Sequence, residues 1–302
     1  MEKRKNTKLR AIDLLVILVC LFGIVLNIAL FWRDLNKTLT KLYEEHIATV
    51  TYKYKAAQRK FVDRVLWDRL RQEAPVYNGD IIRTADLSQA RITFLDGQYI
   101  ELFENTLAQV FWDKKGVLVD FAGGDININS HVGKNAFVLS SGNNRIEVAA
   151  GGMLNAKKGG KSGAGTDADQ PLNVMLFEGY ATLTSASGDM QNITAGSALS
   201  FMMDGSQDSI PMVAVLSPIP GTQVLNSSFE PYPVHFTWKA NNFSDGETVY
   251  IEVSQDTSFK RPVYSSEIRT GTQAEVPISS GAYWLRVYPS SYKDADDNVK
   301  NF

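Results

Sequence analysis

One long apolar stretch near the N-terminus constrains this chain more than any other feature of its sequence. The nineteen residues from Leu14 to Trp32 read LLVILVCLFGIVLNIALFW, in which Asn27 is the strongly polar exception. As an α-helix the stretch would extend about 28 Å, which matches the roughly 30 Å hydrocarbon core of a bilayer. The sequence therefore predicts a transmembrane helix, with Arg33 directly after it.

The charges before this stretch predict its orientation. Residues 1–10 contain five basic residues, the last of them Arg10, against the single acidic residue Glu2. A dense positive flank favours the cytoplasmic side, so we expect everything after the span to be exported. A cleaved signal peptide is the alternative, but Leu30-Phe31-Trp32 does not resemble the small residues of a cleavage site. The prediction is a bacterial inner-membrane protein with one span and periplasmic C-terminal domains.

Composition limits what stabilises the exported part. Cys20 is the only cysteine of the 302 residues and lies within the predicted span, so we expect no intramolecular disulfide there. The net charge of −2 gives no sign of nucleic-acid binding. Some 270 residues follow the span, which is enough for two domains with packed apolar cores.

A short helical pattern follows the span. Leu35, Leu39, Leu42, Tyr43 and His46 fall on one helical stripe, which predicts a helical stalk over residues 33–46. The stripe covers barely two heptads, fewer than a sustained coiled coil needs, so a solvated spacer is favoured over a dimerising stalk.

From residue 47 onward the apolar residues recur with a period of two, the pattern of half-buried strands. Ala90, Ile92 and Phe94 alternate before Asp96-Gly97, a strong hairpin signal. Gly123-Gly124 is interpreted as a further turn between strands. We predict an all-β domain over residues 47–208, a sandwich or short solenoid, with a flexible Gly- and Lys-rich loop inserted at residues 150–170.

A second β domain is predicted over residues 209–302. Five strand candidates follow the proline-punctuated segment 213–221, with Trp238 and Tyr283 as expected core residues. In this order the segments resemble an immunoglobulin or fibronectin type III-like module. A seven-stranded sandwich needs a strand after residues 283–287, so we expect either a truncated domain or an open edge that invites self-association or peptide capture.

A family resemblance rests on one stretch of the first β domain. The residues that carry it run G-D-x-I-R-T, then S-x-A, then F-x-D-G-x-x-I-x-L: Gly79, Asp80, Ile82, Arg83, Thr84, Ser88, Ala90, Phe94, Asp96, Gly97, Ile100 and Leu102. This pattern resembles the periplasmic FecR domain, and a looser likeness covers residues 47–203. The resemblance implies a periplasmic β domain that meets other envelope components.

The resemblance departs from the family plan before the span. The best-known family members join this domain to a cytoplasmic anti-sigma domain and relay a signal from an outer-membrane receptor. Only about ten residues precede the span here, too few for such a domain. We therefore expect the chain to act outside the cytoplasm or within the bilayer.

The sequence does not predict catalytic or metal chemistry. His46, His131 and His235 are isolated from one another, which does not predict a zinc site. Residues 155–162, NAKKGGKS, end like a phosphate-binding loop but lack its first glycine. Asp294, Asp296 and Asn298 resemble the start of a calcium loop, yet Val299 stands where its glycine belongs. We expect no enzyme activity and no cofactor.

One charged trio is a weak binding candidate. Arg83, Asp80 and Asp96 lie beside predicted tight turns, where charges more often tie loops together. We expect these residues to be structural.

These observations predict a non-enzymatic periplasmic scaffold or sensor that binds an envelope protein or peptidoglycan. The expected surfaces are the 150–170 loop and exposed aromatic residues near Trp112. A regulatory subunit is the alternative, in which Asn27 contacts a neighbouring membrane signalling protein; a cell-wall-modifying enzyme is a third and weaker one. Homo-oligomerisation stays open.

Overall fold

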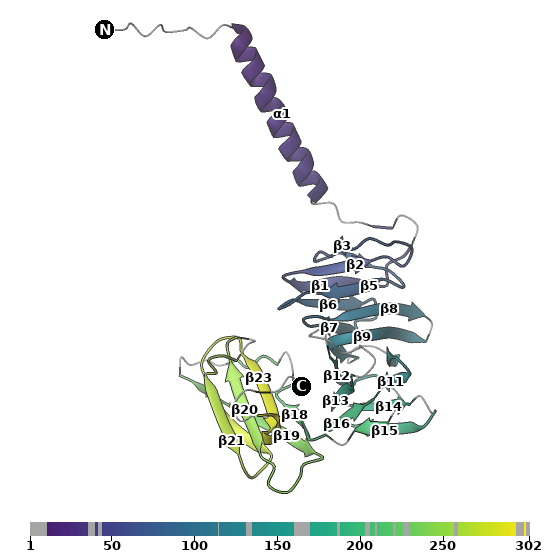
Figure 1. Cartoon of the computed structure of the whole chain (residues 1–302), viewed down its shortest axis with the longest axis vertical. Helices are drawn as coiled ribbons and strands as arrows, with labels where there is room; N and C mark the ends of the chain where they lie inside the picture. Colours follow the sequence, from purple (N-terminus) through teal and green to yellow (C-terminus); the bar gives the residue numbers. More distant parts are fainter. Residues whose placement is uncertain are drawn as a thin grey trace, which may run out of the picture. The chain divides into compact units, whose positions relative to one another are not determined.

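The computed structural model describes a chain that is mainly β, with one N-terminal helix (Figure 1). The fold class therefore agrees with the sequence prediction. The described residues are 11–35, 40–41, 44–113, 115–130, 135–159, 170–185, 188–202, 206–208, 210–219, 222–225, 230–256, 259–293 and 299.

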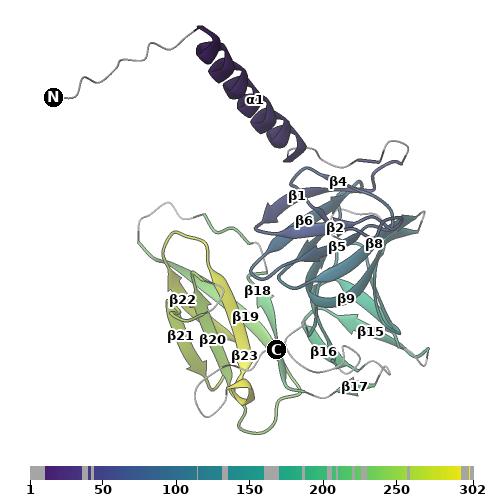
Figure 2. The same cartoon turned by 45° about the horizontal axis from the view of Figure 1, so that its top comes forward.

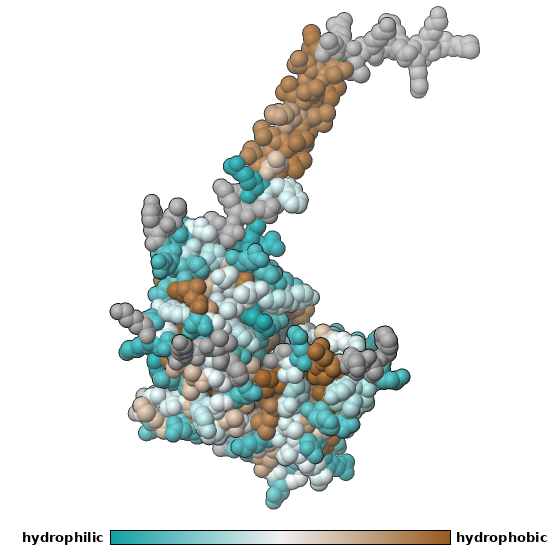
Figure 3. Space-filling model, turned by 180° about the vertical axis from the view of Figure 1, so that it is seen from behind, coloured by the Kyte–Doolittle hydropathy of each residue, from teal (hydrophilic) through white to brown (hydrophobic). Residues whose placement is uncertain are grey.

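The helix α1 (Ala11–Leu35) contains the predicted span. Within it, Ile12–Arg33 is long and apolar enough to cross a membrane, and it is the one such helix among the described residues. Its apolar side chains are exposed, including Leu14 and Trp32, and Figure 3 shows the apolar surface that they form. A helix that is apolar all round needs an apolar environment. Arg10 lies outside the described residues.

The predicted helical stalk over residues 33–46 is confirmed through Leu35 and is wrong at the described residues beyond it. The helix ends at Leu35, and residues 40–41 and 44–46 are not helical, while Leu39, Leu42 and Tyr43 lie outside the described residues. An apolar stripe only two heptads long makes too few contacts to stabilise a helix that has no packing partner.

The first β region consists of two sheets that share one strand. Sheet A runs in the order β4 (Pro75–Val76), β1 (Ala48–Tyr54), β6 (Gln89–Phe94), β7 (Tyr99–Leu102), β9 (Gly116–Asn129), β12 (Met153–Lys158), β13 (Leu172–Glu178), β16 (Ser197–Phe201) and β17 (Gln207–Asp208). Sheet B runs in the order β3 (Asp68–Arg69), β2 (Ala57–Lys60), β5 (Ile81–Thr84), β8 (Leu107–Asp113), β9, β10 (Phe137–Ser141), β11 (Asn144–Val148), β14 (Tyr180–Thr184) and β15 (Met190–Thr194).

The shared strand β9 corrects the predicted turn at Gly123-Gly124. Its first half pairs with β8 in sheet B, and its second half pairs with β7 and β12 in sheet A. The strand crosses between sheets at Gly124, whose φ is +106° and where a Cβ would lie 2.3 Å from the Thr106 Cα. Glycine is needed there because any other residue would be strained and would clash with the backbone of Thr106.

One apolar cluster fills the space between sheets A and B. It includes Ile92, Ile100 and Ile126 from sheet A and Val110 and Leu139 from sheet B, all completely buried. The period-two pattern of the sequence places these residues inward and their polar neighbours outward. The inner face of sheet A therefore packs against sheet B, and its outer face carries polar side chains.

The second β region contains two three-stranded sheets (Figure 2). Their orders are β18 (Met212–Ser217), β19 (Tyr232–Asn241), β22 (Gln273–Ile278) in one, and β21 (Tyr264–Ile268), β20 (Val249–Ser254), β23 (Trp284–Pro289) in the other, followed by η1 (Ser290–Tyr292). Trp238 is buried in their shared core and Tyr283 packs against it, as expected. In the described part of the chain, β23 pairs along one side only, with β20.

The predicted loop at residues 150–170 is wrong over its first half. Met153–Lys158 forms β12, which pairs with both β9 and β13 inside sheet A. Glycine and lysine around it suggested a linker, but Leu154 and Ala156 alternate inward and are completely buried. Asn155 to Lys158 therefore belong to a strand and not to a phosphate-binding loop. Residues 160–169 lie outside the described residues.

Candidate functional site

The residues of the G-D-x-I-R-T pattern form a buried structural turn. The Asp80 N–H donates to the Tyr77 carbonyl at 3.1 Å, and the Tyr77 N–H donates to the Asp80 carboxylate at 2.9 Å. Gly79 has φ +82°, which this turn requires and glycine adopts without strain. The Gly79 N–H then donates to the Val110 carbonyl at 2.8 Å, so the turn joins β5 to β8.

Asp80 also forms a buried ion pair. Its carboxylate lies 3.6 Å from the Arg59 guanidinium, and both side chains are almost completely buried. Arg59 donates to the Pro75 carbonyl and lies 4.3 Å from the centre of the Phe61 ring. Burial lowers the pKa of Arg59, and the charge of Asp80 opposes that shift. A charge this buried stabilises the fold only while its partner is present, which makes the cluster structural.

The predicted trio of Arg83, Asp80 and Asp96 is not brought together. Arg83 is exposed, donates to the Gln58 amide oxygen at 2.8 Å and lies 4.0 Å from the centre of the Trp67 ring. Successive side chains of an extended segment point to opposite faces, so the side chains of residues 80 and 83 lie on opposite sides. Asp96 accepts from the Gln98 N–H at 3.0 Å within the β6–β7 hairpin, where Gly97 donates to the Phe94 carbonyl.

Thr84 and Trp112 also have structural contacts. The Thr84 hydroxyl donates to the Phe103 carbonyl and accepts from the Thr106 N–H at 3.0 Å. Trp112 is half-buried against the core, with its ring centre 5.9 Å from that of Phe94. The Trp112 ring therefore packs on the core with part of its surface exposed, and the expected binding surface near it stays a prediction.

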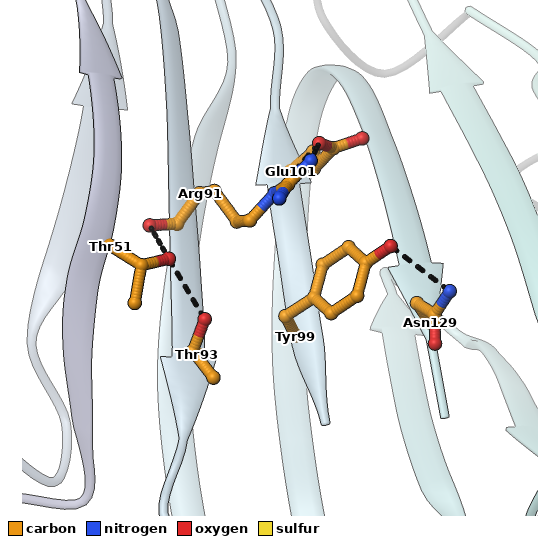
Figure 4. Close-up of polar contacts among 6 residues, drawn as sticks. All are labelled: Thr51, Arg91, Thr93, Tyr99, Glu101 and Asn129. Atoms are coloured by element: carbon orange, nitrogen blue, oxygen red, sulfur yellow. Dashed lines mark hydrogen bonds and ion pairs between the residues drawn. The ribbon is translucent and has the colours of Figure 1, made fainter. Parts of the chain in front are cut away.

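A different set of residues forms an ordered polar surface on the outside of sheet A. We call it the polar face, and it comprises Thr51, Arg91, Thr93, Tyr99, Glu101, Asp125, Asn127, Asn129, Asn155, Lys157 and Asn173. Figure 4 shows six of these side chains on neighbouring strands. Strand register brings them together although more than 120 residues separate the first from the last.

Arginine and aromatic contacts fix one end of the polar face. Arg91 donates to Glu101 at 2.6 Å and lies 4.9 Å from the centre of the Tyr99 ring. Asn129 donates to the Tyr99 hydroxyl at 3.1 Å. Burial and the nearby Glu101 charge raise the pKa of Tyr99, so its hydroxyl is neutral at physiological pH. The Thr51 and Thr93 hydroxyls lie 2.9 Å apart at the margin (Figure 4).

Amides and one carboxylate form the other end of the polar face. The Asn155 amide donates to the Asp125 carboxylate at 2.7 Å and to the Asn127 side-chain oxygen at 2.9 Å. Removal from water raises the pKa of Asp125, while Lys157 and the Asn155 hydrogen bond oppose that shift. Lys157 is the register partner of both Asp125 and Asn173. One positive and one negative charge therefore lie among neutral amides.

A cavity of about 170 Å³ adjoins this end of the polar face. On the sheet A side it is lined by four polar residues, Asp125, Asn155, Lys157 and Asn173, together with Val174 and Met175 of β13. On the other side it is lined mostly by apolar residues of the second β region: Pro211, Met212, Val213, Val287, Pro289 and Tyr292. Asn241 of β19 donates to the Gly196 carbonyl beside β16 at 3.4 Å, which links the two β regions. We call this space the sheet A cavity.

The arrangement suits recognition of a polar ligand. Amides present both donors and acceptors, the carboxylate accepts, and Lys157 donates. Preformed pockets that combine a few polar groups with apolar walls are the usual form of small-ligand sites. A second hollow of about 590 Å³ lies over β11, β14 and β15, lined by residues that include Glu147, Tyr180 and Asn192, but it lacks a comparable hydrogen-bonded network among its described residues.

Sequence reasoning missed the polar face. Its residues occupy the outward positions of alternating strands, as solvent-exposed side chains do. The one signal in the sequence is the density of asparagine at those positions, at residues 127, 129, 155 and 173.

Comparison with known proteins gives little further information. No family model matches the chain, so the FecR likeness stays a prediction. An uncharacterized protein of Treponema pallidum (strain Nichols) is 23% identical over 257 residues, covering 81% of this chain and 37% of that protein. The chain thus spans little more than a third of the length of that relative. A crystal structure of a candidate anti-sigma factor from Parabacteroides distasonis ATCC 8503 has a TM-score of 0.33 at 14% identity, covering 42% of this chain and 57% of that one; a likeness this weak assigns neither fold nor function.

Proposed function

We propose that this chain is a membrane-anchored, non-enzymatic binding protein of the bacterial envelope, acting as a scaffold or sensor. The observation that carries the proposal is the polar face, an ordered array of hydrogen-bonding side chains on a rigid sheet. Rigid positioning lowers the entropy lost on binding, which favours recognition. The proposed function is binding alone and assigns a catalytic role to no residue.

The anchor supports the location. The apolar side chains of α1 are exposed along its length, and the basic residues 3–10 precede it. A bilayer would cover this apolar surface, and the positive flank would keep the N-terminus in the cytoplasm. The β regions would then lie in the periplasm, which is the location that the FecR-like pattern implies.

A regulatory subunit is a second candidate function. The Asn27 amide donates to the Gly23 carbonyl at 2.8 Å within α1, which leaves its side-chain oxygen as an acceptor for a neighbouring helix. Asn27→Leu should then reduce co-purification with a membrane signalling protein, whereas an unchanged yield would favour a plain anchor.

In-cell crosslinking tests the proposed function. A photoreactive residue replaces Thr51, an exposed residue of the polar face, in the full chain; the matched control replaces Asn192, an exposed residue of β15 in sheet B. We expect the Thr51 position to capture an envelope protein or peptidoglycan and the control to capture neither.

The location is tested in the same cells. The chain should resist alkaline extraction from membranes, and protease added to spheroplasts should digest the β regions. Capture from Asn192 alone, or protection of the β regions from protease, would overturn the proposal. Capture of a second copy from Thr51 would instead identify the polar face as a self-association surface.

A further inference from the structure

We propose that the sheet A cavity binds a neutral sugar residue of a glycan. The inference rests on the proposed function and names the class of ligand that the polar face takes. Four features of the cavity support it: an unsatisfied acceptor, walls of two kinds, balanced charge and small size.

The unsatisfied acceptor is the side-chain oxygen of Asn173. It is buried, lines the sheet A cavity, and has no hydrogen-bond partner among the described residues. A buried acceptor left without a donor destabilises the folded chain. A ligand hydroxyl or amide N–H in the cavity would supply the missing donor. The neighbouring Asn155 and Asp125 add acceptors and donors for further hydroxyls.

The two walls match the two kinds of surface on a sugar ring. A pyranose carries hydroxyls around its rim and C–H groups on its faces. The sheet A wall offers amides and a carboxylate beside Val174 and Met175, whereas Met212, Pro289 and Tyr292 offer apolar and aromatic surface. An aromatic ring with a polar tip packs well against such a mixed ligand. A wholly apolar ligand would leave the Asn173 side-chain oxygen without a donor.

The charge of the cavity selects against ions. Asp125 and Lys157 are register partners on β9 and β12, so one negative and one positive group face the same space. A phosphate would be repelled by the carboxylate, and a cation by the ammonium group. The pair instead suits a neutral ligand that both donates and accepts hydrogen bonds.

The size of the cavity limits what enters it. A volume of about 170 Å³ lies below the roughly 300–1,000 Å³ of pockets for drug-sized ligands, so the cavity suits a small ligand such as one sugar ring. The polar face continues from the cavity across β9 to β7, where Glu101 is the register partner of Asn127. Further rings of the same glycan would lie along that row.

Calorimetric titration of the full chain tests the inference. The chain is held in a detergent without a sugar headgroup, because maltoside and glucoside detergents would compete. The probes are chitotriose, which carries N-acetylated sugars, and maltotriose, which does not. We expect saturable binding of at least one probe; preference for chitotriose would indicate a cell-wall type of glycan, and preference for maltotriose another saccharide.

Two variants and one control locate the site. Asn173→Ala should weaken binding about tenfold, the equivalent of one good hydrogen bond. Tyr292→Ala should also weaken binding, and it decides the matter if Asn173→Ala does not fold. Asn192→Ala removes an asparagine from sheet B, outside the sheet A cavity, and should bind as the parent chain does.

Absence of binding to both probes would overturn the inference, as would parental affinity in both Asn173→Ala and Tyr292→Ala. Such a failure is distinguishable from failure of the proposed function, because crosslinking from Thr51 would still capture a protein partner if that function is correct.

Discussion

Two arginine–carboxylate pairs in the first β region differ in their exposure to solvent: one is buried in the fold and the other lies on the polar face. Arg59 and Asp80 lie 3.6 Å apart and are buried to 3% and 0% side-chain exposure, whereas Arg91 and Glu101 lie 2.6 Å apart with 41% and 11% exposure. The shorter pair is the one that reaches water. Burial, and not distance, sets the consequence of losing a partner, because an exposed charge is stabilised by solvent and a buried one is not.

Removal of Asp80 should have the largest effect. Asp80→Ala leaves the Arg59 guanidinium buried without its carboxylate, and we expect a loss of about 3–5 kcal/mol in the free energy of unfolding. Denaturant unfolding of the full chain in detergent, followed by tryptophan fluorescence, measures it. Glu101→Ala is the matched control and should lose about 1 kcal/mol or less. Equal losses in the two variants would contradict the distinction.

The crossing strand that supports the polar face gives the next largest effect. Gly124→Ala forces a Cβ against the Thr106 backbone at a φ of +106°, so we expect a loss of about 1–3 kcal/mol or more. Gly123→Ala is the control, because its added Cβ would make an ordinary contact 3.4 Å from the Gly159 carbonyl oxygen. The same denaturant measurement applies. Similar stability in the two alanine variants would show that the crossing of β9 between the sheets does not need glycine at position 124.

Arg83 should have a smaller effect, although it belongs to the same sequence pattern as Asp80. Arg83→Ala removes a hydrogen bond to Gln58 and a contact with the Trp67 ring at an exposed site, worth about 0.5–1 kcal/mol. The melting temperature should fall slightly, and crosslinking from Thr51 should not change. A loss as large as that of Asp80→Ala, or loss of partner capture, would show that the two residues act together.

Local sequence rules predicted the parts of this fold that depend on neighbouring residues. Alternation identified the strands around Ile92 and Ile146, and Asp96-Gly97 identified the β6–β7 hairpin. These features follow from side-chain period and turn geometry, which a short segment contains in full. The sequence also predicts a structural role for Asp80, because charges beside tight turns commonly satisfy backbone groups, and its carboxylate accepts a hydrogen bond from the Tyr77 N–H.

The failures all depend on distant partners. Met153–Lys158 resembles a linker until β9 and β13 pair on either side of it, and Gly123-Gly124 resembles a turn until the two sheets share one strand. The polar face is the extreme case, since Asp125, Asn155 and Asn173 meet only through register. No local pattern encodes which outward residues of three strands become neighbours.

Replacing Asp125 should raise the stability of the folded chain, whereas replacing the structural residue Asp80 should lower it. Burial raises its pKa, so the folded chain holds the proton more tightly than the unfolded chain. Its contribution to stability therefore decreases as pH rises through the unfolded pKa of about 3.9 to the higher folded value. Asp125→Asn removes that penalty and should be more stable than the parent at pH 7, with the difference disappearing below about pH 3.9.

The most direct test of the account combines two measurements on Asp125→Asn at pH 7. Asp125 is expected to give up stability for recognition, so this variant should unfold at a higher denaturant concentration than the parent and bind the sugar probe more weakly. A variant that loses both stability and affinity would show Asp125 to be a structural residue like Asp80. One that gains stability and keeps full affinity would contradict the assignment of the sheet A cavity.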